Sequence, residues 1–406
     1  MKRVIMRSLN ANSLMIFTLI ALSIMVSACT QEKSLATIQI EEQNGLDRIL
    51  TYVSVEIPLI NSLKNSEMLM VIDSESGTSI PVQVVDTIQD QGTSKLTILF
   101  PIAIKANTTR TFQLMITDKM NHITASDIEL SKDALSVENK TYKAFFSSEY
   151  DERGGQINGI LLKDFDNQLL KRGHISMHWA PNFSKSISDS YFNFEHLSSS
   201  SLNDIRNGRY QIVKIRSGTT DSVPEIDLKG KYSFYGGLPY FEFESTMLMK
   251  KDVTLNLLRN DEMTMDSLFT HVVYKKKDGK ISRLKLYDQE LDVLETNPIP
   301  DDAAFVAFYH RDKGYGLGSI RLEYDNTNES GNPSPTYHPY TKISKSSSNG
   351  RYWNRILTDT IQKFPKGSRY TEKNAYLIFK VDKDIPEKEI LYYQERLLRP
   401  LHISLK

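Results

Sequence analysis

From Ile38 onward, apolar and polar residues alternate with a period of two through most of the chain. Residues 52–57, 95–100 and 111–116 are clear examples. Successive side chains of a strand point to opposite faces of a sheet, so this alternation predicts strands that are buried on one face. Turn-forming pairs such as Ser76-Gly77 separate the runs. The pattern therefore predicts an all-β protein with mostly antiparallel sheets.

Helical periodicity is rare in the sequence. No amphipathic stripe of useful length occurs before residue 130, and the clearest helix candidate is residues 386–398, where apolar side chains share one face. The predicted strands fall into two groups along the chain. We therefore expect a small N-terminal β-sandwich at residues 39–130 and a larger, mostly antiparallel β-domain with few helices at residues 131–406.

The N-terminus has the features of a lipoprotein signal peptide. Three basic residues precede the uncharged apolar run 14–26, and Ser27-Ala28 then precede Cys29, the only cysteine of the chain. The run is short for a transmembrane anchor, which is the alternative. A single cysteine also excludes a disulfide framework. We predict a signal peptide at residues 1–28, lipidation of Cys29, a tether at residues 29–38 and attachment to the outer membrane through the lipid.

Charge and motifs exclude several function classes. The chain has 50 basic and 50 acidic residues, and the signal peptide removes three bases (Lys2, Arg3 and Arg7), which leaves 47 against 50. This balance does not fit a nucleic-acid-binding protein. The sequence contains no Gly-x-Ser-x-Gly, His-Glu-x-x-His, P-loop or dinucleotide motif. We therefore expect no cofactor and no metal.

The first cluster of candidate site residues lies at Arg172–Trp179. If this segment is a strand, His174 and His178 share one face and Trp179 lies on the other. The two histidines are candidates for binding substrate, whereas two ligands alone give little support to a metal site. A solvated strand edge is the alternative.

The second cluster, Arg259–Glu262, breaks the apolar pattern after the strand at residues 253–257. Loops held by a sheet often carry functional residues, and a plain turn is the alternative. His271 follows inside an apolar run, so it is either a site residue or a histidine with its partners in the core.

Two further clusters combine aromatic, basic and histidine side chains. Tyr309-His310 stands at a predicted strand end before a glycine-rich turn that contains Tyr315, and an ordinary polar turn is equally consistent with it. Tyr340 and the segment Arg351–Arg355 interleave aromatic rings with arginines. Rings of this kind stack on sugars and guanidinium groups pair with carboxylates, so this pattern favours a carbohydrate ligand over a plain edge strand.

Residues 135–164 resemble the opening of the galactose-mutarotase-like β-supersandwich. This fold is common in sugar-processing enzymes, including the C-terminal β-region of family 38 mannosidases and the β-domains of several polysaccharide lyases. The resemblance implies that the large β-domain is a supersandwich that follows a small sandwich. The residues that carry it are Glu138, Asn139, Tyr142, Gly154, Gly155, Ile157 and Asp164.

The whole mature chain further resembles lipoproteins from polysaccharide-use loci of marine Bacteroidota, a family associated with oligosaccharide dehydratases that act on ulvan fragments. The segments that carry this resemblance are residues 259–263, 310–316, 324–328, 338–340 and 351–355. It implies a carbon–oxygen lyase that acts by β-elimination on the uronic acid of an ulvan-type oligosaccharide and leaves a 4,5-unsaturated uronate. The alternatives are a non-catalytic glycan-binding lipoprotein and a mutarotase-like or glycosidase-like enzyme that uses Glu262 or Asp261.

β-Elimination needs a base for the C5 proton, an acid for the leaving oxygen and a cation that neutralises the uronate carboxylate. His310 is the first choice as base and His271 the second, with Tyr309 or Tyr340 as acid and Arg259 or Arg351 on the carboxylate. The predicted catalytic residues are thus His310, Tyr309, His271 and Arg259. The predicted substrate-binding residues are His178, Trp179, Glu262, Tyr315, Tyr340, Arg351 and Trp353.

Overall fold

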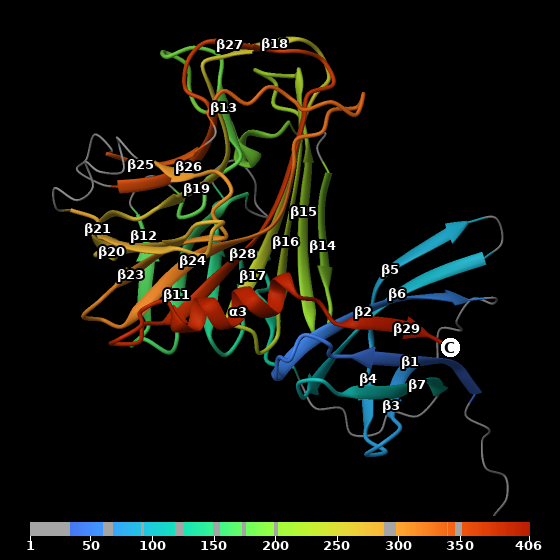
Figure 1. Ribbon diagram of the computed structural model, residues 1–406. Coiled ribbons are helices and arrows are strands. Elements are labelled where there is room, and N and C mark those ends of the chain that lie inside the picture. Colours follow the sequence, from blue (N-terminus) through green and yellow to red (C-terminus); the bar gives the residue numbers. More distant parts are fainter. Residues whose placement is uncertain are drawn as a thin grey trace, which may run out of the picture.

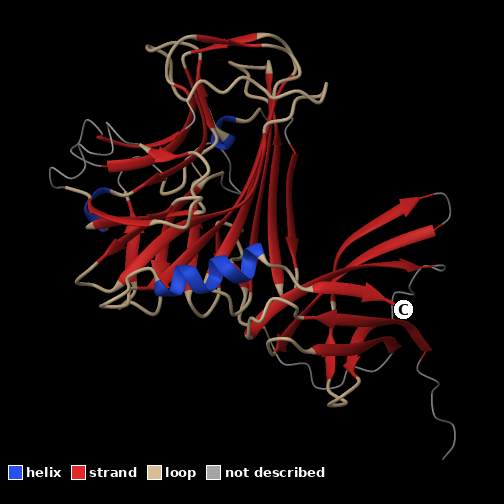
Figure 2. Cartoon of the chain, in the orientation of Figure 1, coloured by secondary structure: helices blue, strands red, loops and turns tan. Residues whose placement is uncertain are grey.

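The computed structural model describes residues 33–59, 68–90, 93–117, 126–148, 155–172, 176–198, 202–287, 298–338, 340–345 and 351–406. The predicted signal peptide, Cys29 and His174 lie outside these residues. Strands make up most of the described chain (Figures 1 and 2). The prediction of an all-β, mostly antiparallel fold is therefore confirmed.

The small N-terminal sandwich has two sheets, with strand orders β29-β1-β7-β3-β4 and β2-β6-β5. Its core is apolar and includes Ile38, Val53, Ile98 and Phe112. The strands are β1 (Lys33–Glu41), β2 (Arg48–Leu59), β3 (Met68–Asp73), β4 (Ser79–Pro81), β5 (Gln83–Asp90), β6 (Thr93–Ile104), β7 (Thr109–Thr117) and β29 (His402–Leu405).

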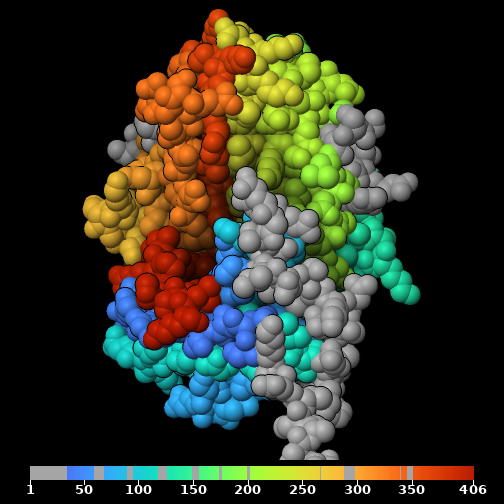
Figure 3. Space-filling view, turned by 90° about the vertical axis from the view of Figure 1, so that its right-hand side faces the viewer, coloured from blue at the N-terminus to red at the C-terminus, as the bar shows by residue number. Residues whose placement is uncertain are grey.

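Two boundaries of this sandwich differ from the sequence prediction. Strand β1 begins at Lys33, inside the predicted tether, because residues from Lys33 onward pair with β7. Strand β29, which we assigned to the large domain, pairs with β1 instead. Figure 1 shows β29 beside β1, and in Figure 3 the red C-terminal part of the chain lies against blue N-terminal residues. A four-residue strand carries no sequence signal that names its partner sheet.

The large sandwich is built on a nine-stranded antiparallel sheet, with strand order β14-β15-β16-β17-β28-β24-β23-β20-β21. Its strands are β14 (Leu202–Asn207), β15 (Gln211–Gly218), β16 (Ile226–Tyr235), β17 (Tyr240–Met249), β20 (His271–Lys275), β21 (Ile281–Lys285), β23 (Phe305–His310), β24 (Tyr315–Asp325) and β28 (Arg369–Lys380).

Two five-stranded sheets cover one face of the large sheet, which we call its inner face, and enclose the main apolar core with it. The first has the order β12-β11-β10-β9-β8 and the second β13-β19-β26-β25-β22. The strands are β8 (Glu129–Leu130), β9 (Ser136–Glu138), β10 (Tyr142–Phe146), β11 (Ile157–Leu162), β12 (Gln168–Lys171), β13 (Asn182–Ser184), β19 (Leu257–Thr264), β22 (Ile299–Pro300), β25 (Tyr340–Lys345) and β26 (Arg351–Thr358). A separate ribbon pairs β18 (Val253–Leu255) with β27 (Gln362–Phe364), and the short 3₁₀ turns are η1 (Phe194–His196) and η2 (Asp266–Leu268).

The outer face of the large sheet is covered by helix α3 (Lys388–Leu398), which corresponds to the predicted helix (Figure 1). Ile390 packs there against Ala307, Leu377 and Phe379 in a second apolar cluster. No helix among the described residues is long and apolar enough to span a membrane. The large sheet thus has two differently covered faces, and this decides which side chains can meet.

Candidate functional site

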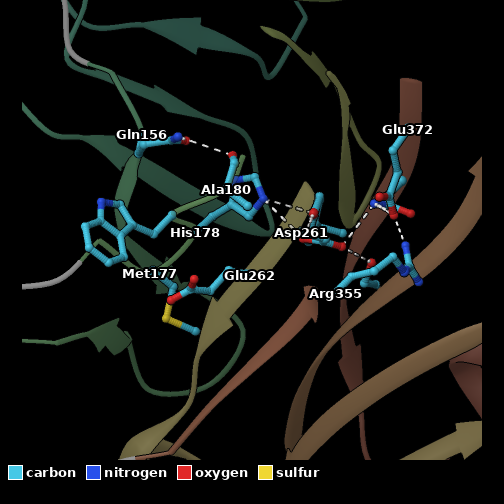
Figure 4. Close-up of polar contacts among 12 residues, drawn as sticks. Gln156, Met177, His178, Ala180, Asp261, Glu262, Arg355 and Glu372 are labelled. Carbon is cyan, nitrogen blue, oxygen red and sulfur yellow. Dashed lines mark hydrogen bonds and ion pairs between the residues drawn. The ribbon is translucent and has the colours of Figure 1, made fainter. Parts of the chain in front are cut away.

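The segment Arg259–Glu262 lies in the middle of β19 and contains a β-bulge. The register with β26 shifts here, so that Arg259 opposes Ile356, Asp261 opposes Arg355 and Asn260 opposes no residue. A bulge redirects the side chains that follow it. Asp261 consequently points between the sheets, whereas Glu262 points away from them (Figure 4).

Asp261 is the centre of a buried group of polar side chains that we call the polar seam. Its carboxylate accepts hydrogen bonds from the Tyr376 hydroxyl at 2.6 Å, from the Asn374 amide at 3.0 Å and from the Ser319 hydroxyl at 3.2 Å. The Nε2 atom of His178 lies 3.5 Å from the same carboxylate. Burial raises the pKa of Tyr376 well above its ordinary value, so the phenol stays protonated and remains a donor.

His178 connects Asp261 to the other end of this group through its two ring nitrogens. Its Nε2 lies 2.9 Å from the Tyr376 oxygen and its Nδ1 lies 2.7 Å from the Tyr232 oxygen. The Tyr232 hydroxyl in turn donates to Gln156 at 2.9 Å. The polar seam therefore continues from Asp261 through Tyr376, His178 and Tyr232 to Gln156.

The far end of the polar seam reaches β26 and β28. Arg355 forms an ion pair with Glu372, and its Nε lies 3.1 Å from a carboxylate oxygen of Asp301. Burial, reinforced by the nearby charge of Arg321, lowers the pKa of Arg355 to about 10. The members of the polar seam are almost inaccessible. Their hydrogen bonds and ion pairs fasten β19 and β26 to the large sheet and fix the bulge.

A second group of polar side chains lies on the side of β19 that faces away from the large sheet. We call this group the outer site, and its members are Arg259, Glu262, Asn182 and Asn354. Asn182 is opposite Arg259, and Asn354 is opposite Glu262, so these four side chains share one face of the sheet. Arg259 Nη1 donates to Glu262 Oε2 at 2.7 Å, and the Asn182 amide donates to the same oxygen at 2.9 Å.

The charge of Arg259 is retained despite its burial. Burial lowers the pKa of Arg259, but the negative charge of Glu262 and the neighbouring phenol of Tyr352 offset this, and the pKa ends above its ordinary value. The outer site therefore holds a fixed guanidinium in a shielded position.

Aromatic rings surround this guanidinium. The Arg259 carbon Cζ lies 5.3 Å from the ring centre of Tyr352 and 5.7 Å from that of Tyr191. Trp179 contacts Tyr191 edge to face, with ring centres 5.7 Å apart. Tyr191 is 43% exposed. Partly exposed rings around a shielded cation present both stacking surfaces and polar groups, which is the combination that a sugar needs.

Several buried polar atoms of this region have no hydrogen-bond partner among the residues that the structure describes. They are Arg259 Nε, Asn182 Oδ1 and both side-chain amide atoms of Asn260 and Asn354. Native proteins leave few such atoms unpaired, and a ligand or ordered water is the usual explanation. Their concentration on β13, β19 and β26 makes the outer site the strongest candidate for a functional site.

The structure separates the predicted catalytic residues. Tyr309 and His310 are consecutive on β23 and therefore point to opposite faces of the large sheet. His271 lies beside Tyr309 on the outer face, with ring centres 5.0 Å apart, whereas His310 lies near Tyr315 on the inner side. The four predicted catalytic side chains therefore do not meet on one substrate.

Three predicted substrate-binding residues lie in the core. Trp353 and Tyr315 are 0% and 1% exposed, and His178 is 2% exposed inside the polar seam. Trp353 and Tyr352 are consecutive on β26, so their side chains point to opposite faces of the sheet, Trp353 inward and Tyr352 outward. The two aromatic residues of the Arg351–Arg355 segment thus have different roles, and Trp353, Tyr315 and His178 have no surface to offer a sugar. His178 lies outside the named strands, in an isolated bridge to Met263, so the predicted strand does not form there.

The structure brings Trp179, Arg259 and Glu262 together in the outer site, and it places Tyr340 on the neighbouring β25. Lys342 is opposite Asn354, on the same side of its sheet as the outer site, and its Nζ lies 5.6 Å from the ring centre of Tyr340. Arg351 instead lies over the ring of Tyr287 at 5.1 Å.

Sequence reasoning missed Tyr191 and Asn182, and within the segment Arg351–Arg355 it assigned substrate binding to Arg351 and Trp353 and not to Tyr352 and Asn354. Alternation along residues 351–355 would have separated Tyr352 and Asn354 from Trp353, whereas no local pattern marks Tyr191 or Asn182. The described residues contain no group of three or more His, Cys, Asp or Glu side chains that could hold a metal.

No protein-family model matches the chain, and no curated protein matches its sequence. Among solved structures it is similar to a glycosyl hydrolase family 38 protein from Enterococcus faecalis, with 11% identity and a TM-score of 0.52 over 98% of this chain and 51% of that one. An α-mannosidase from Enterococcus faecalis V583 matches with 10% identity and the same TM-score of 0.52, over 98% and 49%. A galactose mutarotase related enzyme from Lactobacillus acidophilus matches 60% of this chain and 97% of its own, with 9% identity and a TM-score of 0.34.

The chain spans about half the length of the two Enterococcus proteins. At this level of identity the likeness shows a shared fold. It confirms the β-sandwich architecture implied by the resemblance to family 38 mannosidases, and that architecture is found in carbohydrate-active enzymes.

Proposed function

We propose that the protein is a carbohydrate-active enzyme that binds an acidic oligosaccharide at the outer site and cleaves a bond of its uronic acid by β-elimination. The observation that carries this proposal is the guanidinium of Arg259, held between the rings of Tyr191 and Tyr352 and next to buried amides without partners. These groups match a ligand with an anionic group, hydroxyls and an apolar ring face. The resemblance to ulvan dehydratases makes ulvan fragments the first substrate to test.

The chemistry follows from the side chains at hand. Arg259 pairs with the uronate carboxylate, which stabilises the negative charge that develops when the C5 proton leaves. One of Tyr352 and Tyr191, acting as the phenolate, takes that proton and becomes a neutral phenol. The other, a neutral phenol, gives its proton to the oxygen that leaves C4 and becomes a phenolate. The C5–H and C4–O bonds break as the C4–C5 double bond of the 4,5-unsaturated uronate forms. Glu262 and Asn182 hold the guanidinium in place.

A mutarotase-like or glycosidase-like enzyme is the second candidate, and the fold shared with a family 38 protein favours it. The pair Asp261 and Glu262 does not supply the facing carboxylates of a glycosidase, because these residues point to opposite sides of β19 (Figure 4). A glycosidase would therefore have to use other acids.

The test is to incubate the mature protein with uronate oligosaccharides, ulvan fragments first, and to follow the ultraviolet absorbance of the unsaturated product and its mass. We expect Arg259→Ala to lower kcat/KM by about 10²–10³-fold, as removal of a charge-stabilising donor does in other enzymes. Tyr352→Phe should also lower kcat, and the helix variant Tyr392→Phe, also a partly exposed tyrosine, should leave it unchanged.

Binding by calorimetry without any new absorbance would make the protein a glycan-binding lipoprotein. Release of sugar from neutral mannosides, without unsaturated product, would favour the glycosidase-like candidate. Equal activity of Arg259→Ala and wild type would remove the outer site from the mechanism.

We also propose that the protein acts at the outer membrane, attached through lipid on Cys29. The supporting features are the apolar run 14–26 and the small residues before Cys29. Mass spectrometry of the membrane fraction should find an acylated N-terminal Cys29 in the wild type, and Cys29→Ala should appear uncleaved and without lipid. A Cys29→Ala chain that is processed normally would contradict this.

A further inference from the structure

A second concentration of polar side chains lies on the outer face of the large sheet, at its β21 edge. His271 pairs with Tyr309 on one side and with Lys285 on the other, so these three side chains form a row across β23, β20 and β21. With the turn before α3 they line a cavity of about 280 Å³ that we call the basic cavity. The nine-stranded sheet and the five-stranded sheet that contains β19 lie between the basic cavity and the outer site.

Four cations line the basic cavity: Arg283, Lys285, Arg311 and Lys383. Arg283 is neutralised by an ion pair with Glu387. Within the described part of the chain, the side chains of Arg311 and Lys383 form no ion pair, and the only acidic residue in the lining is Asp384. The cavity therefore has an excess of positive charge.

The floor of the basic cavity is fixed by hydrogen bonds through Thr270. The Thr270 hydroxyl donates to the backbone oxygen of Tyr309 at 3.2 Å and accepts from the backbone nitrogen of Arg311 at 3.1 Å. The same hydroxyl lies 2.8 Å from His271 Nδ1, within hydrogen-bond distance. The imidazole, stacked on Tyr309 at an interplanar angle of 17°, is held in one orientation.

We propose that the basic cavity is a binding site for an anionic sugar substituent, a sulfate half-ester or a carboxylate. Arg311 and Lys383 pair with the anion, and the half-buried imidazole of His271, backed by the buried ring of Tyr309, packs against the sugar ring. The basic cavity is separate from the outer site, because the large sheet and the sheet that contains β19 lie between them. It gives the protein a second point of contact with an acidic polysaccharide, independent of the reaction assigned to the outer site.

The test is calorimetric titration of the Arg259→Ala protein, so that the outer site does not contribute, with inorganic sulfate, galactose 6-sulfate and glucuronate. We expect Arg311→Ala with Lys383→Ala to weaken binding of the preferred anion about tenfold or more, since two charge-assisted contacts are lost. The control Lys250→Ala with Lys251→Ala removes the same charge at an exposed turn and should change affinity less than twofold.

The ligand series separates the two sources of the anion. Preference for galactose 6-sulfate identifies a sulfated sugar, and preference for glucuronate identifies a carboxylated one. Equal weakening by both double variants would show nonspecific charge attraction and overturn the proposal, as would the absence of saturable binding. Arg311→Lys with Lys383→Arg keeps both charges and should retain binding, which guards against loss of fold as the cause.

Discussion

The two sandwiches of this protein have cores of different chemistry. The core cluster of the small sandwich is apolar. Its buried acids, Glu42 and Asp73, lie beside turns, where each accepts backbone hydrogen bonds and pairs with one arginine, Arg48 or Arg110. The core of the large sandwich is crossed by the polar seam, from Gln156 through Asp261 to Arg355. Buried polar groups are costly unless they are paired. A core that contains a chain of buried polar groups is therefore shaped by a requirement beyond the packing of apolar side chains.

The constraint in the large sandwich is the position of β19. The polar seam holds the bulge that turns Asp261 inward, and the same bulge places Arg259 and Glu262 together on the outside. The small sandwich carries no such arrangement among its described residues. The difference indicates that the small sandwich is a scaffold and that the functional surface belongs to the large one.

The largest effect that would test this contrast is the removal of the seam's central carboxylate. Asp261→Ala leaves the Tyr376 hydroxyl, the Asn374 amide and the Ser319 hydroxyl without their acceptor. Because each buried donor left unpaired costs about 1–3 kcal/mol, we expect a loss of about 3–5 kcal/mol in the free energy of unfolding. Chemical denaturation followed by tryptophan fluorescence measures it, because Trp179 and Trp353 both lie in the large sandwich.

The exposed acid Asp86 of the small sandwich provides the control, and Asp86→Ala should cost less than about 1 kcal/mol. Asp261→Asn keeps the shape of the side chain and one acceptor oxygen, so it should cost less stability than Asp261→Ala. If Asp261→Ala cost no more than Asp86→Ala, the polar seam would not be what holds β19.

Much of the fold followed from the sequence because it depends on local alternation. Strands at residues 52–57, 95–100 and 111–116 and the helix at its predicted place all form. What alternation does not contain is which strands become neighbours. The pairing of β29 with β1 joins residues more than 350 positions apart, and no local pattern specifies such a contact.

The candidate site was predictable only in part for a related reason. Arg259 and Glu262 were found because they interrupt an apolar run, and Trp179 was found because it stands in a cluster with His174 and His178. The bulge at Asn260 shifts the parity of the strand by one residue, so the sequence alone does not tell which of Asp261 and Glu262 faces the core. Tyr191 and Asn182 reach the outer site from distant segments, which only the folded chain brings together.

The smaller effect that sharpens the comparison is the response of the two cores to pH. Burial raises the pKa of Asp73, but hydrogen bonds from Ser76 and Arg110 more than offset this and hold the pKa below its ordinary value. The unfolded chain therefore binds this proton first as the pH falls, so the small sandwich should lose stability below about pH 4.

The large sandwich should respond at the opposite end of the pH range. Burial raises the pKa of Tyr232 and of Tyr376 well above the ordinary value. As the pH rises, the unfolded chain loses these protons first, so the stability that the neutral phenols contribute is lost above about pH 10. Hydrogen exchange with mass spectrometry should show peptides around Asp73 losing protection in acid and peptides around Tyr232 and Tyr376 losing protection in alkali. Tyr376→Phe removes one titrating phenol and should reduce the loss of protection in alkali around β28 while leaving the response around Asp73 unchanged. If Tyr376→Phe left the alkaline response of the β28 peptides unchanged, the buried phenol of Tyr376 would not set the stability of the large core at high pH.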